Sequence, residues 1–94
     1  MDLKKAEKHV KALKKIFPDS FISTTDDFYN VDPKDSKVVG LWTGFLEDGT
    51  MDEWGHDNSG TGYYVDPKLQ KYLKKHSLYW EPYDSGTLMI YEDL

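Results

Sequence analysis

The stretch Lys37–Gly55, KVVGLWTGFLEDGTMDEWG, joins a nine-residue apolar run to a short return run through an Asp-Gly pair. An Asp-Gly pair between two such runs is a strong short-range signal for a β-hairpin. We therefore predict a β-hairpin whose two-residue turn is Asp48 and Gly49. The rest of the chain is interpreted around it.

The predicted register leaves the hairpin without a polar face, because opposed residues of an antiparallel pair share a face. One face carries Val39, Leu41, Thr43, Phe45 and Trp54, and the other carries Val38, Gly40, Trp42, Gly44, Leu46 and Met51. A one-residue slip would exchange the two faces. This pattern favours a central position in a sheet, with at least partial cover on both sides.

Trp42 stands between two glycines, which lets its ring lie flat along the sheet. Aromatic cover of a glycine on a neighbouring strand stabilises sheets, and we favour this structural role for the ring. The alternative is an exposed aromatic platform for a partner or a ring-shaped ligand.

Two amphipathic helices are expected, at Asp2–Phe17 and Asp66–His76. Apolar residues recur at helical spacing in both segments, and lysines occupy the other sides. Asp2 and Asp66 are suitable N-caps, and a proline follows the first helix. In the second helix the predicted inward residues are Leu69, Tyr72, Leu73 and His76.

The remaining segments predict strands and loops. Ser20–Thr25 is β-prone, 26–36 is a loop, and Leu78–Asp84 returns as Thr87–Glu92 after a turn at Ser85 and Gly86. Pro82 cannot donate to a strand ladder, so its strand should lie at an edge. The order α-β-β-β-α-β-β predicts an α+β fold: one domain, residues 1–94, with two helices on an antiparallel sheet of about five strands.

The composition indicates a soluble intracellular protein. The chain has 94 residues, is 15% aromatic and lacks cysteine, so we expect neither disorder nor a disulfide framework. We find no signal peptide and no apolar run of the length a membrane span requires, and we expect a cytoplasmic location without membrane contact. The net charge of −5 is unevenly distributed, since ten of the twelve lysines lie in the two predicted helices.

Acidic residues gather around the predicted hairpin, beside two tryptophans. We interpret this region as a contact surface for another protein or for a second copy of the chain. The candidate partner-binding residues are Trp42, Glu47, Asp48, Asp52, Glu53, Trp54, His56 and Asp57. The preferred function is that of a small non-enzymatic interaction protein.

Three other functions were weighed. The lysines of the helices could follow a nucleic-acid backbone, although the chain as a whole is acidic. Conversely, the acidic remainder of the chain could imitate nucleic-acid phosphates, as some small phage-encoded accessory proteins do. Paired carboxylates beside aromatic rings are also what glycoside hydrolysis uses, which makes a small hydrolase a third, less favoured alternative.

No cofactor, metal or catalytic residue is expected. Asp52, His56 and Asp57 could approach a metal ion, but their spacing matches neither the helical zinc-protease motif nor the calcium loop. The Gly-Thr-Gly at 60–62 invites a phosphate-cradle interpretation, yet three residues separate it from the next predicted helix. A glycine loop that reverses the chain is the favoured interpretation.

Overall fold

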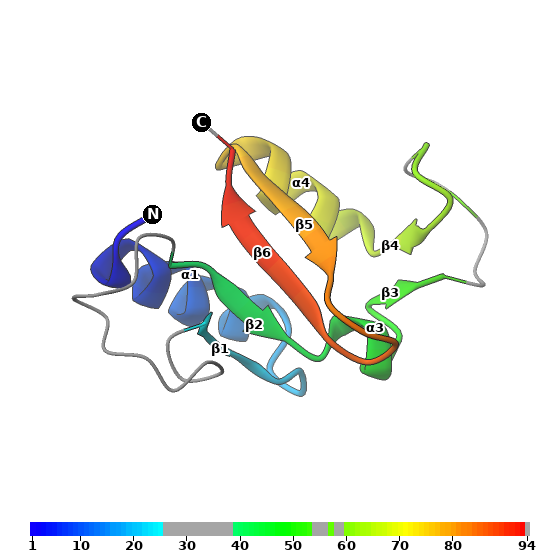
Figure 1. Ribbon diagram of the computed structural model, residues 1–94, viewed down its shortest axis with the longest axis horizontal. Coiled ribbons are helices and arrows are strands. Elements are labelled where there is room, and N and C mark those ends of the chain that lie inside the picture. The colour runs from blue at the N-terminus through cyan, green and yellow to red at the C-terminus, as the bar shows by residue number, and fades with distance from the viewer. Residues whose placement is uncertain (26–38, 54–56, 58–59, 94) are drawn as a thin grey trace.

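The computed structural model describes residues 1–25, 39–53, 57 and 60–93, and its fold is α+β, as predicted. The helices are α1 (Leu3–Ile16), α3 (Phe45–Asp48) and α4 (Pro67–Lys75). The strands are β1 (Ile22–Thr24), β2 (Leu41–Thr43), β3 (Met51–Asp52), β4 (Tyr64–Val65), β5 (Leu78–Pro82) and β6 (Leu88–Glu92) (Figure 1).

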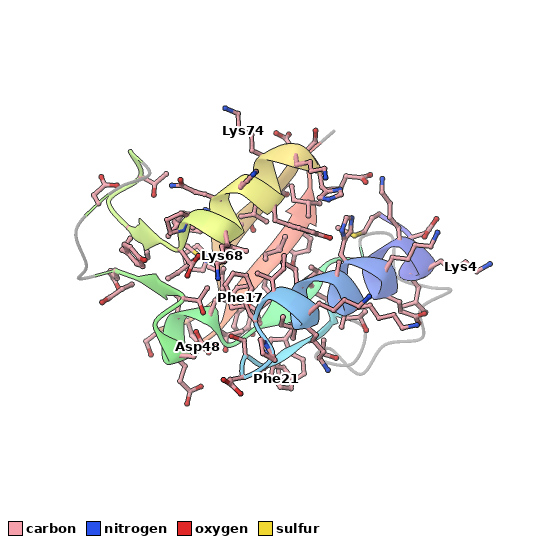
Figure 2. The ribbon with its side chains drawn as sticks, turned by 180° about the vertical axis from the view of Figure 1, so that it is seen from behind. Lys4, Phe17, Phe21, Asp48, Lys68 and Lys74 are labelled. Atoms are coloured by element: carbon pink, nitrogen blue, oxygen red, sulfur yellow. The ribbon has the colours of Figure 1, made fainter. Side chains whose placement is uncertain are left out.

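The main sheet has four antiparallel strands in the order β1-β2-β6-β5. Helices α1 and α4 both lie on one face of this sheet, behind it in Figure 1 and in front of it in Figure 2. The strands β3 and β4 form a separate two-stranded sheet at one end of the molecule. The described part of the molecule is therefore layered, with both long helices on the same side of the main sheet.

Both long helices begin and end where the sequence predicts. The side chain of Asp2 accepts a hydrogen bond from the Lys5 backbone N–H at 2.8 Å, and Phe17 caps the other end of α1. The side chain of Asp66 accepts from the Lys68 backbone N–H at 2.8 Å. Capping of this kind satisfies backbone donors that have no partner within the helix.

The side of α4 that faces the core contains fewer residues than the sequence predicts. Leu69 and Leu73 are buried and Tyr72 is half-buried, but His76 is exposed. His76 is the C-cap of α4, so the helical periodicity that would have turned its side chain inward ends there. The prediction was wrong for His76.

The predicted hairpin does not form. Strand β2 pairs with β1 on one side and with β6 on the other, so both of its edges are occupied. Strand β3 pairs instead with β4, with Met51 opposite Val65 and Asp52 opposite Tyr64. The central position predicted for the apolar run is confirmed, but the strand partner predicted for it is wrong.

The Asp-Gly pair ends a helical turn rather than a hairpin. The backbone N–H groups of Glu47 and Asp48 both donate to the Gly44 carbonyl at 3.0 Å, which starts α3. Gly49 has φ +86° and follows the last helical residue, and the Asp48 side chain accepts from the Thr50 N–H. A left-handed glycine serves a helix C-terminus as well as it serves a hairpin turn, so the local signal was ambiguous.

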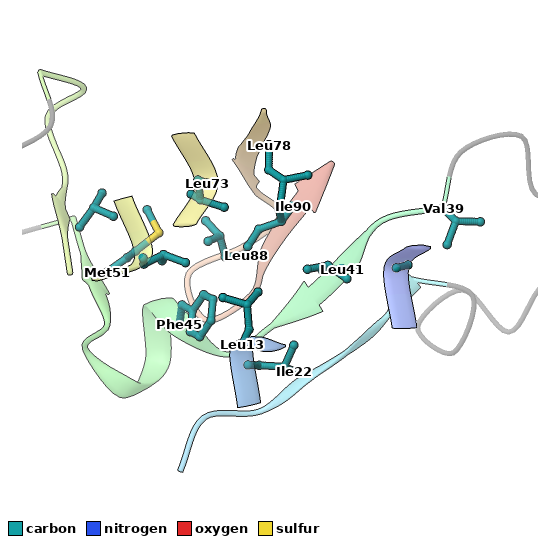
Figure 3. Packing of buried hydrophobic residues seen from close by; sticks show 13 residues of the cluster. Leu13, Ile22, Val39, Leu41, Phe45, Met51, Leu73, Leu78, Leu88 and Ile90 are labelled. Atoms are coloured by element: carbon teal, nitrogen blue, oxygen red, sulfur yellow. The ribbon is translucent and has the colours of Figure 1, made fainter. Parts of the chain in front are cut away.

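The hydrophobic core lies between the main sheet and the helices (Figure 3). Its largest buried side chain is Phe45, which α3 turns inward against Phe17, with ring centroids 5.5 Å apart. Met51 was predicted on the Trp42 face, but it is fully buried in this core because β3 belongs to the second sheet. The core cluster comprises Ala6, Leu13, Ile22, Val39, Leu41, Phe45, Met51, Val65, Leu69, Leu73, Leu78, Leu88 and Ile90.

Aromatic cover of a glycine does occur, but Tyr91 supplies it instead of Trp42. A Cβ atom added to Gly40 would lie 2.5 Å from Tyr91 Cδ1 and 2.5 Å from the Ile90 carbonyl oxygen. The Trp42 ring contacts Phe21 instead, with centroids 4.7 Å apart. The glycine at position 40 therefore allows a close approach between β2 and β6 and makes room for the tyrosine ring.

In the part of the chain that the structure describes, no helix is both long enough and apolar enough to cross a membrane.

Candidate functional site

The face of the main sheet that turns away from α1 and α4 is the candidate site. Register places the side chains of Ser23, Trp42, Met89 and Glu81 in one row across all four strands, because opposed residues share a face. Tyr91 and Tyr79 form the next row, with ring centroids 5.9 Å apart. We call this surface the outer face; it comprises Phe21, Ser23, Trp42, Tyr79, Glu81, Met89 and Tyr91.

Large apolar side chains of the outer face reach solvent. Phe21 is 51% exposed and Tyr79 is 40% exposed, whereas Trp42 and Tyr91 are half-buried and Met89 is buried, so the outer face is open to solvent in part. Nearby, in the loop that joins β5 to β6, Tyr83 is 54% exposed. Neighbouring aromatic side chains that stay exposed are typical of surfaces that bind a partner.

A shallow groove of about 370 Å³ opens at one end of the outer face. The rings of Phe21 and Trp42 form one wall, at an interplanar angle of 64°, and the side chain of Glu47 from α3 forms another. The β5–β6 loop closes the groove through Gly86 and Thr87. Two aromatic rings and a carboxylate thus share a single concave surface.

The charge around the groove is negative. Glu81 lies on the outer face, and Asp84 lies in the neighbouring loop, where it accepts hydrogen bonds from the backbone N–H groups of Gly86 at 2.9 Å and Thr87 at 2.8 Å. The bond from Gly86 is the main cause that lowers the pKa of Asp84 below its ordinary value. Every lysine in the described part of the chain belongs to α1 or α4, on the opposite side.

The predicted contact residues are only partly brought together. Trp42 and Glu47 line the same groove, and Asp48 lies one residue further on α3, pointing away from the core in Figure 2. Asp52 and Glu53 are exposed on and beside β3, in the other sheet. Trp54 and His56 lie outside the described residues. The described acidic residues are therefore divided between α3 and the second sheet.

Asp57 has a local structural role. Its carboxylate accepts hydrogen bonds from the backbone N–H groups of Gly60 at 2.9 Å and Gly62 at 3.0 Å. Both glycines have positive φ, as a tight chain reversal requires. The amides that a phosphate group would need are thus occupied by this side chain.

The other chemical interpretations gain no support from the geometry. Among the residues that the structure describes, no three histidine or acidic side chains are grouped so that they could hold a metal ion. Glu47, Asp48, Asp52 and Glu53 are all exposed. General acid catalysis near neutral pH usually relies on a carboxyl group removed from water, which none of these four provides.

Sequence reasoning missed Phe21, Tyr79 and Tyr91 as members of the candidate site. The sequence of β5 and β6 does contain a signal that places the two tyrosines on the outer face. Along these strands, core residues alternate with Tyr79, Glu81, Met89 and Tyr91. Alternation alone does not say which strands are neighbours. Only the order β1-β2-β6-β5 brings these residues beside Trp42.

In comparisons with known proteins, no family model, curated protein or solved structure gave a significant match. Functional proposals for this chain therefore rest on its own surface.

Proposed function

We propose that this protein is a non-enzymatic binding module whose outer face contacts a basic segment of a partner protein. The observation that carries the proposal is the one-sided cover of the main sheet: α1 and α4 occupy one face, and exposed aromatic side chains occupy the other. Exposing Phe21 and Tyr79 to water is unfavourable unless a partner covers them for part of the time.

The groove indicates what kind of side chain the partner presents. An arginine or lysine that lies against the exposed face of the Phe21 or Trp42 ring gains a cation–π interaction, and the Glu47 carboxylate supplies the opposite charge. Glu81 and Asp84 add negative charge nearby. A second copy of the chain is a poorer partner for this face, because a symmetric contact would bring these acids of both copies together.

In this proposal the remaining acids act at a distance. Asp48, Asp52 and Glu53 would attract a basic partner towards the groove without forming part of it, since long-range charge mainly accelerates association. We place the interaction in the cytoplasm, in keeping with a chain that has no cysteine.

A titration with an acetylated tri-arginine peptide, followed by ¹H–¹⁵N NMR, tests the proposal. The expected result is a saturable shift of the Trp42 indole resonance and of the Gly86 and Thr87 amides. The substitution Glu47→Gln should weaken binding about fivefold, which is the scale of an exposed charge pair.

The matched control is Glu7→Gln, which removes the same charge from α1, a helix that does not line this groove, and it should leave the affinity unchanged. A tri-glutamate peptide should produce no shift. The proposal fails if tri-arginine causes no saturable shift at Trp42, or if Glu47→Gln and Glu7→Gln weaken binding equally.

Nucleic-acid binding through the helix lysines remains a second candidate, because α1 and α4 lie on the same side of the sheet. Lys4, Lys68 and Lys74 all project from this side of the molecule in Figure 2. A fluorescently labelled DNA duplex should then bind at low salt and lose affinity steeply as salt increases. Failure to bind at about 20 mM salt, where phosphate contacts are strongest, would remove this candidate.

A further inference from the structure

Within the part of the chain that the structure describes, strand β5 has one unpaired edge. It is the last strand in the order β1-β2-β6-β5, so only one of its edges is bonded to β6. At one end of the pair the Asp93 N–H donates to the Ser77 carbonyl at 2.8 Å, and at the other end the Tyr83 N–H donates to the Thr87 carbonyl at 2.9 Å. The positions of these two bonds show which residues of β5 direct their backbone N–H and C=O groups towards β6.

Hydrogen-bonded pairs recur at every second residue of an antiparallel ladder. Because the backbones of residues 77 and 83 both form hydrogen bonds with the strand β6 or its extension, the backbone groups of Tyr79 and Glu81, at the alternate positions between them, also bond to β6. The backbone N–H and C=O groups of Leu78 and Trp80 therefore point away from β6. Pro82 ends this free edge, since it has no N–H to donate.

A groove of about 850 Å³ lies beside this edge. One wall consists of the consecutive β5 residues Leu78, Tyr79 and Trp80, and the opposite wall is α4, with Lys71, Leu73 and Lys74. Segment 61–67 closes one end. The volume lies within the range typical of ligand-binding pockets.

The chemistry of the groove is apolar and basic. Leu73, Leu78 and the Trp80 ring supply the apolar surface, the ring being held at 4.9 Å from that of Tyr63. Lys71 and Lys74 are exposed, and the described residues that line the groove include no acidic residue. A free strand edge beside a helix, with two cationic side chains, suits an extended acidic peptide.

We propose that this groove binds an extended acidic segment of a partner protein, which adds to β5 as a fifth strand of the main sheet. The backbone of the segment bonds to Leu78 and Trp80, alternate apolar side chains enter the groove, and Lys71 and Lys74 attract the negative charge of the segment. This contact shares Tyr79 with the outer face, but it does not depend on the function proposed above.

The free protein provides the first test, by amide hydrogen exchange. The Leu78 and Trp80 amides should exchange with solvent quickly, and the Tyr79 and Glu81 amides slowly, because only the latter pair bonds to β6. The opposite pattern would overturn the proposal, since the edge offered to a peptide would then lack its free donors.

The second test uses an acetylated, amidated peptide of sequence Val-Glu-Val-Glu-Val. It should shift the Leu78 and Trp80 amide resonances saturably and slow their exchange about tenfold, the scale of one hydrogen bond. The double substitution Lys71→Glu and Lys74→Glu should weaken binding at least about tenfold, whereas Lys68→Glu should not, because Lys68 belongs to the same helix but does not line the groove.

The same peptide with every backbone amide N-methylated separates strand addition from side-chain binding alone. Methylation removes the N–H donors while keeping every side chain, so this peptide should lose binding. The proposal is overturned if the methylated peptide binds equally well. It is also overturned if the unmodified peptide shifts resonances of Phe21 and Trp42 rather than those of Leu78 and Trp80.

Discussion

The Nδ1 atom of His9 lies 2.6 Å from the hydroxyl oxygen of Tyr72, which joins α1 to α4 across the helix layer. His9 is only 6% exposed, and its Nε2 atom is buried without a hydrogen-bond partner in the described part of the chain. The His76 ring lies 5.2 Å from that of His9, and Lys5 adds further positive charge. This helix contact therefore depends on a neutral His9.

The stability of the protein should fall as the pH falls below about 6.5. Burial is the main cause that lowers the pKa of His9, followed by the charges of His76 and Lys5, with Glu92 acting in the opposite direction. His9 of the unfolded chain takes up a proton near pH 6.5, whereas His9 of the folded protein does so only at a lower pH. The contribution of His9 to stability is therefore complete above pH 6.5 and declines as the pH falls towards the folded pKa. Urea unfolding at a series of pH values measures the decline.

Two variants isolate this contact. His9→Gln should flatten the pH dependence of unfolding between about pH 5 and pH 7, because the buried titrating group is gone. Tyr72→Phe should cost about 1–3 kcal/mol by leaving the buried Nδ1 atom without its partner. The comparison variant Tyr79→Phe, at an exposed ring, should cost almost nothing. An unchanged pH profile in His9→Gln would contradict the assignment.

Gly40→Ala should destabilise the protein by about 1–3 kcal/mol, the usual cost of overpacking. The added Cβ would lie 2.5 Å from the Ile90 carbonyl oxygen, which belongs to the backbone and has little freedom to move. Gly44→Ala is the control, because its Cβ would lie 3.6 Å from Phe21 Cβ, an ordinary contact. Thermal unfolding of both variants measures the difference, and equal melting temperatures would refute the close approach at Gly40.

Phe45→Ala should cost about 3–5 kcal/mol, because the ring is fully buried against Phe17. Leu46→Ala should cost clearly less, since Leu46 is only half-buried. Gly49→Ala should also destabilise the protein, because alanine tolerates a φ of +86° poorly. Urea unfolding of Phe45→Ala and Leu46→Ala would distinguish the helical turn α3 from the hairpin that the sequence suggests, whereas a positive φ at Gly49 is required in both.

The Asp84 carboxyl should titrate below its ordinary pKa of 3.8, chiefly because it accepts a hydrogen bond from the Gly86 backbone N–H. A lowered folded-state pKa means that this carboxylate stabilises the β5–β6 loop above pH 3.8 and loses that effect as the pH falls further. NMR titration should show the Gly86 and Thr87 amide shifts following the same midpoint. Asp84→Asn should abolish that titration, and a midpoint above 3.8 would be incompatible with the loop geometry.

The sequence predicted those features whose signals lie within a few residues. Asp2 and Asp66 mark the helix starts, and Pro82 marks an edge strand, because capping and the missing proline N–H act locally. The apolar run around Leu41 indicated a central strand, which is confirmed. Of the candidate site, the sequence analysis proposed Trp42 and Glu47 as members of one contact surface, and these two side chains line one groove.

By itself, then, the sequence determined the α+β class, the two amphipathic helices and the separation of basic helices from an acidic remainder. Tertiary structure alone decided that β2 pairs with β6, that Asp48 and Gly49 end a helical turn, and that Tyr91 covers Gly40. The physical reason is that these features depend on contacts between residues far apart in the sequence. A left-handed glycine fits both a hairpin turn and a helix end, and the choice depends on burying Phe45 and on strands from distant parts of the chain occupying both edges of β2.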